Sequence, residues 1–134
     1  MEVLLVDDQA ITVQVFAAAV RQTFSGAKVH TAVDLPEALQ IASGHALDLC
    51  LLDLALPTCS GIDALERFHK AFPEVPVLVV SVSEEKERIQ ACLEAGARGY
   101  LPKSSAVVGL PGAMKIVAAG GRYLPPQAQS PKLH

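Results

Sequence analysis

Residues that could do chemistry follow four apolar runs of this chain. Asp7 and Asp8 follow the run VLLV, and Asp53 follows LCLL. Ser81 follows VLVV, and Lys103 follows GYLP. In a parallel sheet the carboxyl ends of all strands lie at one edge, where such folds build their sites. We therefore expect these five side chains, which are distant in the sequence, to converge.

Three carboxylates and one ammonium group at one edge would leave a net charge of −2. Crowded carboxylates repel one another, and one Mg²⁺ would neutralise them. With magnesium and Lys103 present, Asp53 could attack a phosphoryl group and form an acyl phosphate. Ser81 could donate a hydrogen bond to that group, and Lys103 could pair with its charge. The sequence therefore predicts a Mg²⁺-dependent phosphoryl site.

The strands that would position these residues are mostly continuous apolar runs. Such runs are typical of strands buried on both faces of a parallel sheet. The second run, KVHT, alternates more and is expected at an edge. The expected strands are 2–6, 28–31, 48–53, 77–81 and 98–101.

Helical patterns separate the strands. Asp34 is a candidate N-cap before Pro36 and Glu37, and Gly96 is a candidate C′ glycine. Pro111 is tolerable only in the first turn of a helix. The expected helices are 11–24, the segment after Asp34, Ser60 or Gly61 to Phe72, Ser83 to Ala95, and 110–119. This (βα)₅ order predicts an α/β fold with a doubly wound parallel sheet.

Composition limits the class of protein. The chain has 134 residues, 51% of them hydrophobic, with no Trp and a mean hydropathy of +0.35. Its net charge is −3 and its basic residues are scattered, which does not suit nucleic-acid binding. No signal peptide or membrane-spanning run is visible in the sequence. We expect a cytoplasmic protein without membrane contact.

Cysteines and histidines show no ligand spacing. Three cysteines without a CxxC pair argue against a disulfide framework or a zinc site. The histidines are expected to be structural or exposed. These residues are Cys50, Cys59, Cys92, His30, His45, His69 and His134.

The chain divides after Gly121. Residues 1–121 carry every strand and helix pattern and form one expected domain. Residues 122–134 are rich in proline and are expected to form a linker or tail.

Together these residues resemble the response-regulator receiver domain of bacterial two-component systems. The stretches LEAGARGYLPKSSA and VAAGGRYLPP are most similar to the LuxR/NarL-type subfamily, whose output domain binds DNA. The resemblance implies a flavodoxin-like receiver fold, and a linker that leads to an output domain outside this sequence. It rests on Asp7, Asp8, Asp53 with Leu56, Pro57 and Gly61 behind it, Ser81, Tyr100 and Lys103.

The resemblance also implies roles for the acidic residues. Asp53 would be the phosphorylation site, accepting its phosphoryl group from a sensor histidine kinase. Asp8, Asp53 and the backbone carbonyl of Ala55 would bind Mg²⁺, and Asp7 would assist through water. Such a protein is a phosphoacceptor rather than an enzyme, although the same residues can promote phosphorylation and dephosphorylation of Asp53.

The remaining implied roles concern signalling. Ser81 and Lys103 would bind the phosphoryl group, and Tyr100 would turn inward when Ser81 engages it. The switch would act on a homodimer and control transcription, with DNA contacted only by the C-terminal output domain.

Three alternatives use the same residues differently. A haloacid-dehalogenase-like phosphohydrolase needs a second acid two residues after its nucleophile, where this chain has Ala55. A flavodoxin-like mononucleotide binder needs a first loop that wraps phosphate, and Asp7 and Asp8 would repel phosphate. A pseudo-receiver, which binds partners without being phosphorylated, stays open, although the intact acidic set argues against it.

Overall fold

Five parallel strands form one sheet in the order β2-β1-β3-β4-β5. The computed structural model describes residues 1–56 and 60–126. The expected doubly wound sheet is confirmed, as is the edge position of KVHT, which forms β2. The strands are β1 (Glu2–Val6), β2 (Lys28–Ala32), β3 (Leu49–Asp53), β4 (Val77–Ser81) and β5 (Gly99–Pro102).

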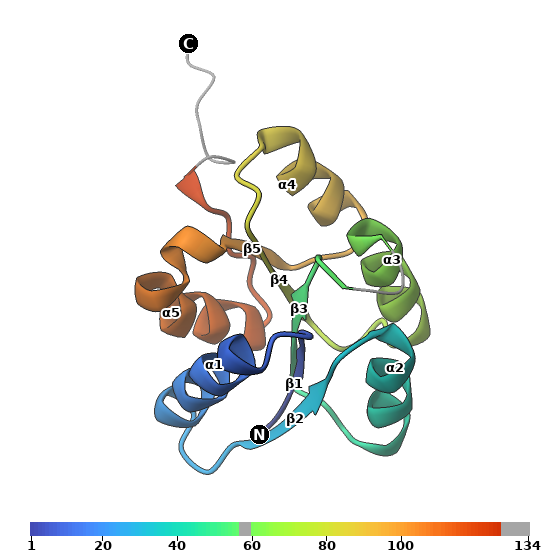
Figure 1. Ribbon diagram of the computed structural model, residues 1–134, viewed down its shortest axis with the longest axis vertical. Helices are drawn as coiled ribbons and strands as arrows, with labels where there is room; N and C mark the ends of the chain where they lie inside the picture. Colours follow the sequence, from blue (N-terminus) through green and yellow to red (C-terminus); the bar gives the residue numbers. More distant parts are fainter. Residues whose placement is uncertain (57–59, 127–134) are drawn as a thin grey trace.

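Helices cover both faces of the sheet. Helices α1 and α5 lie against one face, and α2, α3 and α4 lie against the other (Figure 1). The helices are α1 (Ala10–Thr23), α2 (Leu35–Gly44), α3 (Gly61–Ala71), α4 (Lys86–Glu94) and α5 (Ala106–Ala118). A short 3₁₀ turn, η1 (Lys103–Ser105), joins β5 to α5. None of these helices is long and apolar enough to cross a membrane.

Alternation along each strand divides the apolar side chains between two cores. In β1, Val3 and Leu5 face α1 and α5, whereas Leu4 and Val6 face α2 and α3. All residues of the central strands β3 and β4 are buried. This explains why their sequences are continuously apolar rather than alternating.

Two of the expected helix starts and one expected end are confirmed. The Asp34 side chain accepts a hydrogen bond from the Glu37 amide at 3.0 Å, and Ser60 accepts one from the Asp63 amide at 3.3 Å. Gly96 follows α4 with a φ of +113°, a conformation that favours glycine.

The expected start of the fourth helix at Ser83 is wrong, because α4 begins at Lys86. The Ser83 side chain accepts a hydrogen bond from the Glu85 amide at 3.2 Å, and its carbonyl accepts one from the Tyr100 hydroxyl at 2.8 Å. These contacts hold residues 83–85 as a loop.

The expected start of the fifth helix is also wrong. Helix α5 begins at Ala106, four residues before the expected start, and contains Pro111 in its second turn. Proline there removes one backbone hydrogen bond of the helix. Burial of Ala106, Leu110, Ala113 and Met114 against the sheet favours the helix despite that loss.

The chain returns to the sheet after α5. Tyr123 forms an isolated parallel bridge with Gly99 at the outer edge of β5. The packed part of the molecule therefore extends past Gly121.

Candidate functional site

Three carboxylates meet where β1 and β3 end. Val6 pairs with Leu52, so Asp7 and Asp53 follow in adjacent positions of neighbouring strands. One carboxylate oxygen from each of Asp7, Asp8 and Asp53 lies within 4.8 Å of the others. The sheet register therefore brings together residues that are 46 positions apart in the sequence.

Lys103 joins the group from the neighbouring end of the sheet. Its Nζ lies 3.3 Å from Asp53 Oδ2 and 3.7 Å from Asp7 Oδ2. The Lys103 side chain is only 20% exposed. One ammonium group therefore lies between two buried carboxylates, and the three acids remain in excess.

Backbone amides orient both buried carboxylates. The Gln9 amide donates to Asp7 Oδ1 at 2.8 Å, and the Ala55 amide donates to Asp53 Oδ1 at 3.0 Å. Each amide lies two residues beyond the carboxylate, so the loop leaving each strand holds the side chain that ends it. Both Oδ2 atoms then face Lys103.

The second oxygen of Asp7 is buried without a hydrogen-bond partner among the described residues. Burial raises the pKa of Asp7, and the charges of Asp53 and Asp8 raise it further. The Gln9 amide and Lys103 oppose this rise. A buried carboxylate oxygen beside two other acids is suited to a divalent cation with oxygen ligands. These residues therefore fit the predicted Mg²⁺ site.

Two hydroxyl groups lie in neighbouring strands on the far side of β3 from β1. Ser81 ends β4, and Tyr100 belongs to β5. Ser81 is buried, and its Oγ accepts a hydrogen bond from the Ser83 amide at 3.3 Å. Tyr100 is fully buried and donates to the Ser83 carbonyl at 2.8 Å. Burial raises the Tyr100 pKa, while hydrogen bonding with Ser81 and Ser83 opposes the rise. Ser81 and Tyr100 are therefore linked through the backbone of Ser83.

Gly61 sets the position of the loop behind Asp53. A Cβ atom there would lie 2.5 Å from the Leu54 Cβ and 2.6 Å from the Leu54 carbonyl oxygen. Only glycine allows the start of α3 to approach this backbone so closely. Helix α3 is thus docked directly against the residue that follows Asp53.

The structure places all the predicted chemical residues at this edge. Asp7, Asp53 and Ser81 are buried, whereas Asp8 is exposed. Pro57, which is part of the resemblance, lies outside the described residues. Sequence reasoning missed Ser83, whose amide and carbonyl contact Ser81 and Tyr100, because backbone groups carry no signal in the residue type.

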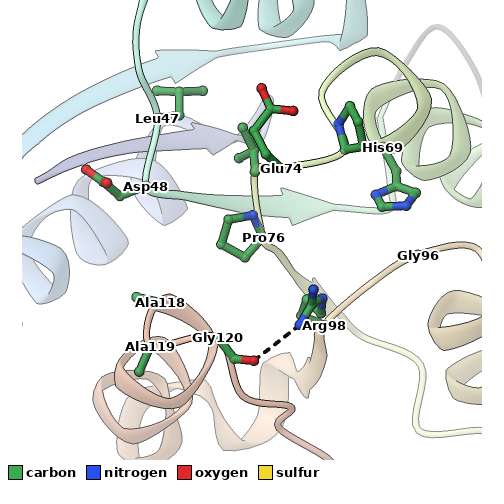
Figure 2. A pocket seen from close by; sticks show the side chains of 12 residues that line it. Leu47, Asp48, His69, Glu74, Pro76, Gly96, Arg98, Ala118, Ala119 and Gly120 are labelled. Atoms are coloured by element: carbon green, nitrogen blue, oxygen red, sulfur yellow. Dashed lines mark hydrogen bonds between the residues drawn. The ribbon is translucent and has the colours of Figure 1, made fainter.

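A pocket similar in size to the one beside Asp7 and Asp8 lies at the opposite end of the sheet, near the strand starts (Figure 2). It measures about 340 Å³ and is lined by residues that precede β3, β4 and β5, including Asp48, Pro76 and Arg98. Arg98 donates a hydrogen bond to the Gly120 carbonyl at 3.2 Å, drawn in Figure 2. No charge cluster like that of the acidic edge gathers among its described lining residues, so size alone does not mark the chemical site.

Comparisons with known proteins agree with this geometry. Residues 3–115 match the family described as the response regulator receiver domain. The glycerol metabolism activator of Pseudomonas putida is 31% identical over 126 residues, which cover 93% of this chain and 57% of that protein. The oxygen regulatory protein NreC of Staphylococcus epidermidis is 30% identical over 125 residues, 92% of this chain and 57% of that protein. The chain thus spans little more than half the length of these curated relatives.

Solved structures show the same fold. A LuxR family DNA-binding response regulator from Silicibacter pomeroyi superposes with a TM-score of 0.81 at 34% identity, over 93% of this chain and 97% of that one. The isolated receiver domain of RcsB from Salmonella enterica serovar Typhimurium reaches a TM-score of 0.87 at 20% identity, over 96% of both chains. This second likeness shows the fold alone. The matched family, the 34% identity to a LuxR family regulator and the shared fold show that this chain belongs to the response-regulator receiver domains of two-component systems, in the LuxR/NarL subfamily.

Proposed function

We propose that Asp53 accepts a phosphoryl group from a sensor histidine kinase in a reaction that requires Mg²⁺. The observation that carries this proposal is the buried Asp7 Oδ2, which has no hydrogen-bond partner among the described residues and lies beside Asp53 and Lys103. An unsatisfied buried acceptor costs stability, and a cation bound at this site would offset that cost.

The acidic residues divide the work of holding the cation. Asp8, Asp53 and the carbonyl of Ala55 would bind the cation directly, and Asp7 would assist through a bound water. The exposure of Asp8 supports a role for it at the open side of the site. When bound, Mg²⁺ supplies positive charge that lets a phosphoryl group approach the carboxylates.

In the transfer step, a carboxylate oxygen of Asp53 attacks the phosphorus atom of the kinase phosphohistidine. A P–O bond forms, the P–N bond breaks, and its electron pair stays on the kinase imidazole. Lys103 already lies 3.3 Å from Asp53, so its ammonium group can pair with a phosphoryl oxygen. Ser81 donates a hydrogen bond from its hydroxyl. The same groups would support attack by water, which returns the free Asp53 carboxylate.

The position of the Tyr100 side chain depends on that of Ser81. Its side chain is already fully buried here, so the inward position does not require a phosphoryl group. Phosphorylation would draw Ser81 toward Asp53 and favour this inward arrangement over an outward one. Phosphorylation would thus change the populations of two states rather than create a new one.

The switch would control a DNA-binding output domain that follows residues 122–134. The similarity to a LuxR family DNA-binding response regulator supports this arrangement. A homodimer in the bacterial cytoplasm, with no membrane contact, completes the proposal. The finer reading, in which the chain promotes its own phosphorylation and dephosphorylation, rests on the same groups.

The test is incubation with a small phosphodonor and Mg²⁺, followed by intact-protein mass spectrometry. We expect one added phosphoryl group, lost in Asp53→Asn and in EDTA. The matched control is Asp63→Asn, which changes an exposed carboxylate on α3 and should label normally. No labelling of the folded wild-type chain by either a phosphodonor or a kinase would favour the pseudo-receiver instead.

A further inference from the structure

A second group of metal-ligating side chains lies at the opposite edge of the sheet from the acidic site. It consists of Glu2 at the start of β1, His30 in β2, and His45, which directly follows α2. Glu2 pairs with Lys28 and Leu4 pairs with His30, so Glu2 and His30 lie on the same face of the sheet. That face is the one covered by α2 (Figure 1), which brings His45 to it.

The two imidazoles converge on one carboxylate oxygen. His30 Nε2 lies 2.9 Å from Glu2 Oε1, and His45 Nδ1 lies 3.3 Å from the same atom. The three potential ligand atoms all lie within 4.8 Å of one another. Zinc binds nitrogen and carboxylate oxygen at about 2.0–2.2 Å with tetrahedral angles, which places neighbouring ligand atoms about 3.3–3.6 Å apart. The two nitrogen-to-oxygen distances, 2.9 and 3.3 Å, are thus already near the spacing of zinc ligands.

The two imidazole rings also lie close together and are tilted with respect to each other. The His30 and His45 ring centroids are 4.1 Å apart, with an angle of 38° between the planes. Two protonated imidazoles at this separation would repel each other, whereas two neutral ones can share a cation. Partial exposure, 20% for His30 and 43% for His45, leaves room for a water ligand and a path to the site.

The ligand types select the metal. Two imidazoles and one carboxylate suit zinc and similar first-row transition ions, whereas Mg²⁺ prefers an all-oxygen set. Three protein ligands leave a fourth position for water. The pattern therefore differs from that of the acidic edge, where all the candidate ligands are oxygen atoms.

Asp48 lies beside Glu2 and holds its backbone. Asp48 accepts a hydrogen bond from the Glu2 backbone amide at 2.8 Å. Asp48 is thus a positioning residue for Glu2.

We propose that Glu2 Oε1, His30 Nε2 and His45 Nδ1 bind one Zn²⁺ ion, independently of phosphorylation at Asp53. Any proton on the two binding nitrogens moves to the other ring nitrogen or to solvent when the metal binds. The ion would link the end of α2 to the edge strand β2 and its neighbour β1. Its occupancy would therefore stabilise the folded chain.

The test is titration of the metal-free chain with Zn²⁺ by calorimetry, and with Co²⁺ by visible absorption, in excess Mg²⁺. We expect one ion per chain and a higher melting temperature with Zn²⁺. The absorption spectrum of bound Co²⁺ should be that of an ion with a low coordination number. His45→Gln and Glu2→Gln should weaken binding by about tenfold or more, since even loss of an outer-shell partner costs that much.

Two matched variants separate this site from others. His69→Gln removes a histidine from α3, and Asp8→Asn removes an acid from the opposite edge; both should bind Zn²⁺ as the wild type does. His45 is exposed, so its replacement should leave the circular dichroism spectrum unchanged. Zinc binding that survives in both His45→Gln and Glu2→Gln, or that is lost in Asp8→Asn, would overturn the proposal.

Discussion

Asp7 and Asp8 are neighbours in sequence but differ in environment. The Asp7 side chain is 6% exposed, while Asp8 is exposed. The sheet register puts Asp7 beside Asp53, and burial then raises the Asp7 pKa. The ionised Asp7 therefore opposes folding at neutral pH in the absence of a metal.

This predicts the effect of Asp7→Asn on stability. Because the folded-state pKa lies above the ordinary value of 3.8, the folded wild-type chain takes up a proton more readily than the unfolded chain. In EDTA at pH 7, where the buried Asp7 of the wild type is ionised at a cost, Asp7→Asn should raise the free energy of unfolding.

The gain should shrink as the pH falls through the folded-state pKa toward 3.8 and below, where wild-type Asp7 is also neutral. Urea unfolding followed by circular dichroism suits a chain without Trp. An advantage that grows on acidification would contradict the assignment.

Lys103 gives a second prediction at this scale. Replacing it with Met removes the ammonium group 3.3 Å from Asp53, so the phosphoryl group loses one source of charge stabilisation. The labelling rate with a small phosphodonor should fall about 100-fold, as for other lost electrostatic contacts. Lys70→Met, at an exposed position of α3, is the control and should label normally. An equal rate in both variants would remove Lys103 from the site.

At the residue scale, strand-end reasoning predicts the convergence of Asp7, Asp53, Ser81 and Lys103. It does not predict which of two adjacent acids is buried, since that depends on register. It also misses the contacts of His45, because that residue belongs to a loop. Loop paths depend on how helices pack, which sequence periodicity does not describe.

At the scale of elements, the approach of α3 to the end of β3 depends on one residue. Gly61→Ala would place a methyl group 2.5 Å from the Leu54 Cβ. Backbone shifts of this kind cost typically 1–3 kcal/mol, so we expect the variant to be less stable by roughly 2 kcal/mol. The displaced loop should also slow labelling of Asp53.

Gly112→Ala is the matched control. Gly112 lies inside α5 with no atom within 4 Å of the position of an added Cβ. Alanine is better than glycine in a helix interior by about 0.8–1 kcal/mol, so this variant should be more stable. Thermal melts of both proteins measure the difference. If Gly61→Ala also gained stability, the close approach of α3 would not constrain the loop.

Sequence patterns locate every strand but misplace the starts of two helices. The error at α4 arises because the contacts of Ser83 with Glu85 and Tyr100 hold a loop. The error at α5 arises because Pro111 is tolerated in the second turn, where burial of the helix outweighs the lost hydrogen bond. Tertiary packing decides both cases, and local propensity does not contain it.

At the scale of the whole molecule, all five long helices are used to cover the sheet (Figure 1). The fold was predictable because five apolar runs separated by helical patterns allow few other arrangements. The sequence does not predict pocket volumes, and the pocket beside Asp7 and Asp8, about 310 Å³, does not stand out from the one of about 340 Å³ at the strand starts. Chemistry, rather than volume, identifies the phosphoryl site.

This arrangement predicts that residues 1–134 do not bind DNA specifically. The net charge is −3, and DNA affinity comes mainly from Lys and Arg that neutralise phosphates. The measurement is a fluorescence anisotropy titration against the promoter region of its own gene at about physiological salt, with and without a phosphate mimic. The control is a scrambled duplex of equal length. Sub-micromolar binding that prefers the promoter would contradict the proposed division of labour.

The return of the chain to β5 has a consequence for truncation. The Tyr123 amide donates to the Arg98 carbonyl at 3.0 Å, and the Tyr100 amide donates to the Tyr123 carbonyl at 3.2 Å. These two bonds cap an edge that would otherwise be open to another chain. A protein that ends at Gly121 would therefore expose unpaired backbone groups of β5 at the edge of the sheet. We expect this shorter protein to self-associate or aggregate. The short segment after α5 thus protects the β5 edge of the sheet from pairing with another chain.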